Sequence, residues 1–426
     1  MNRLFSLAIV ALLSFACSNK GGDVQTFELR SSVRPEVKPS SSISSLPITR
    51  SQQTAFECSS SYSFKALREM HRLVPNRSHL VSPLGYTILL PMVAELAGGD
   101  YIDAMKEELG IQGMPIDDIH RGVGSLMSSM PALDLGTEVS FANLALSADS
   151  PSPLFPDSSR EVWETYYSAL VAEGTHSKEF ASAASKWVYT HTGGRISEPV
   201  IIEGTVLVSS SFYFEAPLKY AFNPKQTSNA SFWGTPDKSV SLPMMHADFL
   251  ARYMQNELYD AIKLPVGDNA KFSLIAVLPH SGTDIPTLLE KLEKENIKGT
   301  WKQDRMVRIS IPKISLSAGV PLSSFSSTLS EIVEKQLSPK LEGNIGILGI
   351  VQNCDFTLDE TGMKGTSRSM MSDIANSLDP ESEPVPEPFV FNANRPFIFT
   401  VIVEDTQIAL YAGLYCNQGN DHAATL

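Results

Sequence analysis

The residue types that most often perform enzymatic chemistry occur in this sequence without the spacing that the chemistry requires. There is no G-x-S-x-G elbow for a nucleophilic serine, no H-E-x-x-H helix for zinc and no Walker-type glycine loop for phosphates. The histidines are scattered, and no two stand four residues apart, so none would chelate a metal from one helical face. Gly343, Gly346 and Gly349 lack the spacing of a dinucleotide fingerprint and the helix that should follow it. We therefore expect neither an enzyme nor a cofactor or metal site.

The composition is that of an acidic globular protein. Of 426 residues, 42% are hydrophobic and 19% are charged, which is enough apolar material for a sizeable core. The formal net charge is −13, and no stripe of lysine and arginine is present to neutralise phosphates, so a nucleic-acid partner is not expected. Four cysteines in a chain of this length rule out a disulfide scaffold.

The first segment predicts export and a lipid anchor. Residues 1–17 have a positive start and then an apolar run that is shorter than the roughly 20 residues needed to span a bilayer, as in a secretory signal. The run ends in L-S-F-A-C, which is similar to a bacterial lipoprotein signal, so Cys17 would be lipidated. The alternative is ordinary cleavage beside a chance cysteine. We expect an exported protein of the bacterial cell envelope, either periplasmic or at the outer membrane and cell surface.

The remainder of the chain predicts one tethered domain. Residues 18–50 are rich in Ser, Pro, Lys and Arg without a sustained period, which favours a flexible tether; the alternative is a short ordered extension. No composition break marks a linker within residues 51–419, so we expect a single large domain, a short tail at 420–426 and a monomer. If Cys17 carries lipid, at most one disulfide can form among Cys58, Cys354 and Cys416.

Periodicity predicts helices first and strands later. Apolar residues on one helical face predict a helix over 56–73, Ser82-Pro83 opens another that runs to Ala97, and further helices are expected near Glu161–Ala172 and Ala181–His191. Segments rich in β-branched and aromatic residues predict strands at Thr205–Phe214, Lys271–Leu278, Val307–Ile311, Pro396–Val403 and Ile408–Leu414. Helices followed by strands indicate an α+β fold, with helices packed on large sheets.

A series of short segments recurs in an order and spacing that one protein family shares. They are Ser82-Pro83 before an apolar helix, Gly99 and Met105 before Leu109-Gly110, Ala142-Asn143 at the start of a strand, Trp187-Val188 with Thr192 and Gly194-Arg195-Ile196, Phe214 with Phe222-Asn223-Pro224, Thr227 and Phe232, Pro243-Met244-Met245, Leu278-Pro279, Ile311-Pro312-Lys313, and Asn394-Arg395-Pro396-Phe397. Together these segments resemble the serpins, a family of protease inhibitors, and the resemblance covers almost the whole predicted domain.

The resemblance implies about three β-sheets with helices packed around them and an exposed reactive-centre loop. In the family the loop is bait: a serine or cysteine protease cleaves it, forms an acyl-enzyme, and is trapped when the cut loop inserts into the main sheet. Distortion of the protease's oxyanion hole then stalls deacylation. We therefore expect a suicide inhibitor. The competing hypothesis is a non-inhibitory serpin-fold surface lipoprotein that acts as a binding or adhesion module.

The loop, residues 360–393, begins with a hinge that must be able to become a strand. Glu360 and Gly362 match the E-x-G of the family, whereas the bulk or charge of Met363, Lys364 and Arg368 departs from its small-residue pattern. Because side chains alternate between faces of a strand, one face would carry Met363, Gly365, Ser367, Ser369 and Met371, and the other Lys364, Thr366, Arg368 and Met370. The charges share one face, which can point to solvent, so we expect the hinge to insert.

The resemblance also implies the position of the reactive bond. A count of roughly sixteen residues from the hinge glutamate, a strand of about 50 Å, reaches Asn376-Ser377, with Ala375 or Leu378 as alternatives because the loop is longer than usual. No lysine or arginine occurs in residues 370–393, so a trypsin-like target is disfavoured. We expect elastase-like, subtilisin-like or papain-like proteases as partners.

The family has a hydrogen-bonded shutter that controls opening of the main sheet. Ser82 matches the serine of this shutter. Ser210 occupies the position where the family usually has asparagine, and Gln352 the position where it usually has histidine. A glutamine side chain can still hydrogen-bond serine hydroxyls, so we expect a rewired network at these positions.

Overall fold

The computed structural model describes residues 39–149, 154–175, 177–197, 199–200, 206–295, 297, 301–321, 326–337, 350–363 and 387–416. The helices within these ranges are α1 (Arg50–Leu73), α2 (Pro83–Ala97), α3 (Gly99–Glu108), α4 (Ile116–Ser129), η1 (Met130–Ala132), α5 (Asp157–Tyr167), α6 (Lys178–His191), η2 (Pro224–Gln226), α7 (Ile285–Glu295) and α9 (Ser327–Leu337). None of these helices is long and apolar enough to cross a bilayer.

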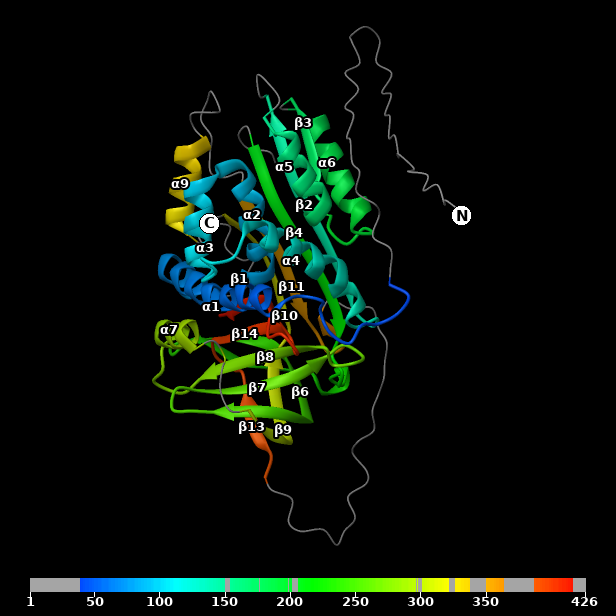
Figure 1. Ribbon diagram of the computed structural model, residues 1–426. Helices are drawn as coiled ribbons and strands as arrows, with labels where there is room; N and C mark the ends of the chain where they lie inside the picture. The colour runs from blue at the N-terminus through cyan, green and yellow to red at the C-terminus, as the bar shows by residue number, and fades with distance from the viewer. Residues whose placement is uncertain are drawn as a thin grey trace, which may run out of the picture.

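A six-stranded sheet forms the upper blade in Figure 1. Its order is β10 (Ile314–Pro321), β11 (Ile350–Leu358), β12 (Gly362–Met363), β4 (Val206–Pro217), β2 (Glu138–Ala148) and β3 (Leu170–Gly174). Strands β4 and β11 also pair directly with each other, in parallel. The two-residue strand β12 therefore lies between two strands that are neighbours over the rest of their contact.

A nine-stranded sheet lies below the blade in Figure 1. Its order is β1 (His79–Val81), β15 (Ala409–Tyr415), β14 (Phe397–Val403), β8 (Phe272–Pro279), β7 (Tyr259–Val266), β6 (Lys238–Gln255), β9 (Lys302–Pro312) and β13 (Phe389–Asn392), with β5 (Ser228–Thr235) paired to β6. The α+β fold class expected from the sequence is confirmed.

Helix α2 occupies the centre of the protein between the two sheets. Ser82 caps the helix by accepting a hydrogen bond from the backbone nitrogen of Gly85 (3.1 Å), and Pro83 stands in the first turn, where a missing N–H costs nothing. Nearly all side chains of α2 are buried, and they contact β4 and β15. The inner faces of both sheets and the helices α1, α2, α4 and α5 share one apolar core.

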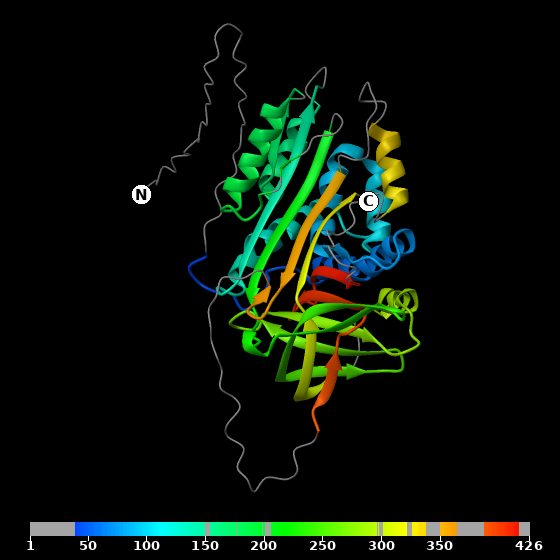
Figure 2. The same cartoon turned by 180° about the vertical axis from the view of Figure 1, so that it is seen from behind.

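The two faces of the six-stranded sheet are covered differently. On the outer face, α6 packs over β2 and β3 through a smaller apolar cluster that includes Phe180, Ala184 and Val188. Figure 2 shows no described helix in front of β4 and β11 on this face. The outward side chains of β4 and β11 are therefore set apart from the core that fixes their inward neighbours.

The structure corrects three details of the sequence predictions. The helix expected near Glu161–Ala172 ends at Tyr167, because Ser168 adopts a left-handed conformation (φ 47°) and the next residues form β3 against β2. Apolar periodicity could not separate these two elements, since both bury their apolar residues. Ala142-Asn143 lies in the middle of β2 rather than at its start.

The third correction concerns the predicted tether. Its last residues lie against the body: the nitrogen of Ile43 donates to the carbonyl of Ala132 (2.8 Å), the Lys271 ammonium donates to the carbonyl of Ser44 (2.6 Å), and Leu46 is buried. Residues 43–46 therefore pack against the body, as in the alternative of an ordered extension, and the predicted boundary at residue 51 is too late. Cys354 and Cys416 are buried free thiols, so the allowed disulfide is not formed by this pair.

Candidate functional site

The seam between β4 and β11 is the part of the fold where the predicted hinge meets the sheet. We use "seam" for the parallel register that runs from Ile350 opposite Val208 to Cys354 opposite Phe212. Beyond Cys354, β12 enters between the two strands, antiparallel to both: Met363 lies opposite Leu358 on one side and Ala216 on the other. The three residues all face the core, and Met363 is only 1% exposed.

A tight turn directs the chain from β11 into β12. The carboxylate of Asp359 accepts hydrogen bonds from the backbone nitrogen of Thr361 (2.8 Å), the hydroxyl of Thr361 (2.7 Å) and the nitrogen of Gly362 (3.2 Å). Gly362 has a φ of 153°, and a Cβ on it would lie 2.4 Å from the carbonyl oxygen of Ala216. Only glycine fits at this crossing, which is the physical reason for the second residue of E-x-G.

Glu360 anchors this turn to the nine-stranded sheet. Its carboxylate contacts the ammonium of Lys313 (2.8 Å) and accepts a hydrogen bond from the hydroxyl of Thr227 (2.8 Å), while its carbonyl accepts one from the nitrogen of Phe222 (2.8 Å). Burial alone raises the pKa of the Glu360 carboxyl, but the hydrogen bonds from Lys313 and Thr227 outweigh burial and leave the pKa below its usual range. Glu360 is therefore held as a carboxylate.

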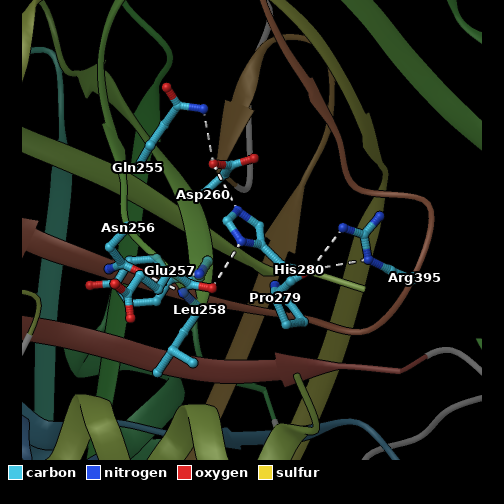
Figure 3. Close-up of polar contacts among 9 residues, drawn as sticks. Gln255, Asn256, Glu257, Leu258, Asp260, Pro279, His280 and Arg395 are labelled. Carbon is cyan, nitrogen blue, oxygen red and sulfur yellow. Dashed lines mark hydrogen bonds and ion pairs between the residues drawn. The ribbon is translucent and has the colours of Figure 1, made fainter. Parts of the chain in front are cut away.

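The distal end of the loop is anchored at the far side of the nine-stranded sheet. Strand β13 pairs in parallel with β9, and Arg395 then donates two hydrogen bonds to the carbonyl of Pro279, from Nη2 (2.7 Å) and Nε (3.1 Å). Figure 3 shows the adjacent His280, whose ring nitrogens lie 3.1 Å from the Asp260 carboxylate and 3.2 Å from the Glu257 carbonyl. The chain is thus fixed at Met363 and again at the start of β13.

Two of the predicted shutter residues, Ser210 and Gln352, lie opposite each other at the middle of the seam, and the third, Ser82, caps α2. The hydroxyl of Ser82 donates to the carbonyl of Leu410 (2.6 Å), and Ser210 of β4 lies opposite Gln352 of β11 and opposite Asn143 of β2. Ser210 Oγ and Asn143 Oδ1 are buried and have no hydrogen-bond partner among the residues described by the structure. The side chain of Gln352, the residue opposite Ser210, lies outside the described residues, so the predicted hydrogen bonding between these two side chains stays a prediction.

Asn143 belongs to a buried polar chain that the sequence did not reveal. Its side-chain nitrogen donates to the carbonyl of Tyr167 (2.8 Å), the hydroxyl of Tyr167 contacts Nδ1 of His120 (2.6 Å), and Nε2 of His120 lies 3.0 Å from the Glu95 carboxylate. These hydrogen-bonded side chains link α2, α4 and α5 to β2 of the six-stranded sheet. Within the described ranges, no group of three His, Cys, Asp or Glu side chains could hold a metal ion.

Comparisons with known proteins assign the family. A family model described as Serpin (serine protease inhibitor) matches residues 57–418. The chain belongs to the serpin family. A serpin-like protein of Thermococcus kodakarensis is 25% identical over 425 residues, with 89% of this chain and 91% of that relative covered. The corticosteroid-binding globulin of Oryctolagus cuniculus is 23% identical over 372 residues, covering 83% of this chain and 92% of the globulin.

Solved structures agree on the fold. Serpin48 of the insect Tenebrio molitor has a TM-score of 0.69 to this chain at 19% identity, and the match covers 86% of this chain and 99% of Serpin48. Serpins are in general inhibitors rather than catalysts, and are commonly secreted or extracellular. The recognition of a serpin from short segments is confirmed.

The structure describes only part of the predicted site. It places Gly362 and Met363 just beyond the end of the seam, Ser210 within the seam and Ser82 at the start of α2. It also adds Lys313 and Thr227, which the sequence did not connect with Glu360. Cys17, the hinge residues Gly365, Ser367 and Ser369, and the reactive-bond candidates Ala375, Asn376, Ser377 and Leu378 lie outside the described residues.

Loss of the Lys313 ammonium should loosen the hinge. In Lys313→Met we expect the amides of Leu218 and Phe222, which donate to Thr361 and Glu360, to exchange hydrogen faster by roughly threefold to tenfold, because the partly exposed ion pair contributes modestly. Hydrogen exchange followed by mass spectrometry measures this. The control is Lys219→Met, which removes an exposed lysine next to Leu218 in the sequence. Equal exchange in both variants would contradict an anchoring role for Lys313.

Protonation of Glu360 at low pH should also loosen the hinge and speed hydrogen exchange. A carboxyl whose pKa is lower in the folded state contributes stability that is present above its ordinary value of 4.5 and is lost as the pH falls through the lowered folded value. Exchange at Leu218 and Phe222 should therefore accelerate as the pH is lowered below 4.5, after correction for the intrinsic exchange rate. In Glu360→Gln the corrected exchange should be fast at every pH. A pH dependence that survives in this variant would assign the effect to another group.

Proposed function

We propose that this serpin is a suicide inhibitor that traps serine or cysteine proteases after cleavage of its loop and insertion of the cut loop into the seam. The observation that carries the proposal is the placement of β12, whose two residues already lie between β4 and β11. Extension of β12 would replace one parallel pairing with two antiparallel ones, and antiparallel pairing is slightly more stable per residue.

The side-chain order of the hinge supports the same proposal. Met363 faces the core, so continued alternation would turn Gly365, Ser367, Ser369 and Met371 inward and Lys364, Thr366, Arg368 and Met370 outward. The residues that would be buried are small or apolar and uncharged. The proposed reactive bond is Asn376-Ser377, with Ala375 or Leu378 as alternatives, and the proposed targets are elastase-like, subtilisin-like or papain-like proteases.

Trapping should leave a covalent complex with the protease. A bulky charge in the hinge should prevent trapping only where the side chain would face the core. Incubation with an elastase-like, a subtilisin-like and a papain-like protease should give an SDS-stable band of summed mass, and loop cleavage should raise the melting temperature. Ser367→Arg would bury a charge, so we expect loss of the band and simple cleavage. Thr366→Arg, one residue away on the outward face, should keep the band.

The same experiment also tests the competing function. Clean cleavage of the natural chain with full protease activity and no thermal shift would overturn inhibition and favour the non-inhibitory binding module. Equal behaviour of Ser367→Arg and Thr366→Arg would contradict the proposed alternation.

We further propose that the exported chain is a lipoprotein of the bacterial cell envelope, anchored by lipid on Cys17 with residues 18 to about 42 as the tether. Cys17→Ala should then release the protein from the membrane fraction, because the thiol that carries the lipid is lost, while Ser18→Ala should leave it there. Fractionation followed by immunoblotting measures the distribution. Continued membrane association of Cys17→Ala would refute the anchor.

A further inference from the structure

His280 lies beside the distal anchor, by which we mean the two hydrogen bonds from Arg395 to the carbonyl of Pro279. Its Nδ1 lies 3.2 Å from the carbonyl oxygen of Glu257, in the turn between β6 and β7, and its Nε2 lies 3.1 Å from the Asp260 carboxylate on β7. Figure 3 shows these groups around the one ring. His280 therefore connects the β6–β7 turn and β7 to the end of β8, where Arg395 holds the chain.

Both oxygen atoms that face the ring of His280 can only accept hydrogen bonds. A neutral imidazole carries one N–H, so it can donate to the Glu257 carbonyl or to the Asp260 carboxylate but not to both. Its other nitrogen then turns a lone pair toward an oxygen. A protonated imidazole carries two N–H groups and satisfies both contacts. The geometry of the site therefore matches the imidazolium form of His280, whose side chain is 35% exposed and so exchanges protons with solvent.

Two other histidines show what a neutral ring needs. His246 lies between two hydroxyls, that of Ser310 (2.9 Å from Nδ1) and that of Ser228 (3.2 Å from Nε2). A hydroxyl can donate or accept, so this ring satisfies both contacts in its neutral form. His120 likewise contacts one hydroxyl and one carboxylate. Neither ring needs the second proton that the arrangement around His280 requires.

The charges on the elements around His280 are mostly negative. Lys291 of α7 is paired with Glu295 (2.5 Å), so Arg395 is the cation among these side chains that opposes a charge on the ring. The Asp260 carboxylate attracts Arg395 as well as the ring. Surrounding acids favour a positively charged imidazole. These acids are Asp260 on β7, Glu257 in the turn, Glu295 on α7 and Asp284 directly before α7.

We propose that protonation of His280 fastens the β6–β7 turn to the distal anchor and makes this end of the protein a pH-sensitive clamp. Histidine is the side chain that ordinarily changes charge between about pH 5 and 8. In the upper part of this range the neutral ring loses its hydrogen bond either to the Glu257 carbonyl or to the Asp260 carboxylate. In the lower part it binds both, and the end of β8 that carries Pro279 is held in place. The clamp belongs to the uncleaved chain and does not depend on the proposed inhibitory function.

The sign of the pH effect follows from the two forms of the ring. The imidazolium gains contacts in the folded chain, so its contribution to stability is present at the acid end of the histidine range and is lost as the pH rises through it. The expected effect of Glu360 has the opposite sign, because its carboxylate stabilises the hinge above its ordinary value of 4.5. Measurements above that value therefore separate the two groups.

Hydrogen exchange of the full chain at two pH values tests the proposal. The reporters in the turn are the amides of Leu258 and Tyr259, which donate to the side chain of Asn256. The reporter beside the distal anchor is the amide of Trp233, which donates to the carbonyl of Asn394. After correction for the intrinsic rate, exchange of these amides should be roughly threefold to tenfold slower at about pH 5.5 than at about pH 8.

Three variants assign this difference to the ring. In His280→Gln it should disappear, because an amide side chain does not titrate in this range. His246→Gln is the matched control and should keep the difference, since His246 lies between two hydroxyls. In Asp260→Asn the new amide nitrogen can donate to a neutral ring, so the second proton is no longer needed and the difference should shrink to less than roughly twofold.

A difference that persists in His280→Gln would overturn the proposal, as would equal exchange at the two pH values in the natural chain. If His280→Gln does not fold, Asp260→Asn decides, and a full difference in that variant would assign the pH dependence to another group. None of these outcomes bears on the trapping of proteases, which the SDS-stable band measures separately.

Discussion

Parallel pairing between β4 and β11 is the constraint on which the other features of this serpin depend. The two strands run in the same direction, so a strand placed between them with opposite direction is antiparallel to both. Such a position exists already at one end, where β12 separates them. The two strands therefore pair directly over five residue pairs, up to Cys354, and the proposed insertion would exchange this parallel pairing for two antiparallel ones, which are slightly more stable per residue.

The contacts around Glu360 hold this arrangement at its starting point. Asp359 forms the turn, and Gly362 permits the close crossing of Ala216. Glu360 ties the turn to Lys313, which directly follows β9, and to Thr227, which directly precedes β5. Together these contacts fix the register of β12 against β11 and β4. Register is thus held firmly at the end of the seam where the proposed insertion would begin.

Local sequence patterns predicted the helices and strands that depend on residues close together in the chain. Helix α1 shows a clear apolar face, α2 carries its own cap in Ser82 and Pro83, and the strands β8, β14 and β15 are continuous apolar runs. The division of residues 161–172 between a helix and a strand depends on pairing with β2, which no local pattern shows. The partners of Glu360 lie 47 and 133 residues away in the chain, and the residues paired across the seam are also far apart in sequence (Ile350 with Val208, for example). Only the E-x-G spacing therefore gave a signal for this site.

The outward face of the six-stranded sheet carries a pair of like charges that pairing rules do not favour. Glu215 opposite Glu138 is an unfavourable choice for a static sheet, where threonine would pair better and need no arginine to shield it. Residues that break a local rule are expected at positions with a second role. Arg195 contacts both carboxylates and so offsets part of this repulsion.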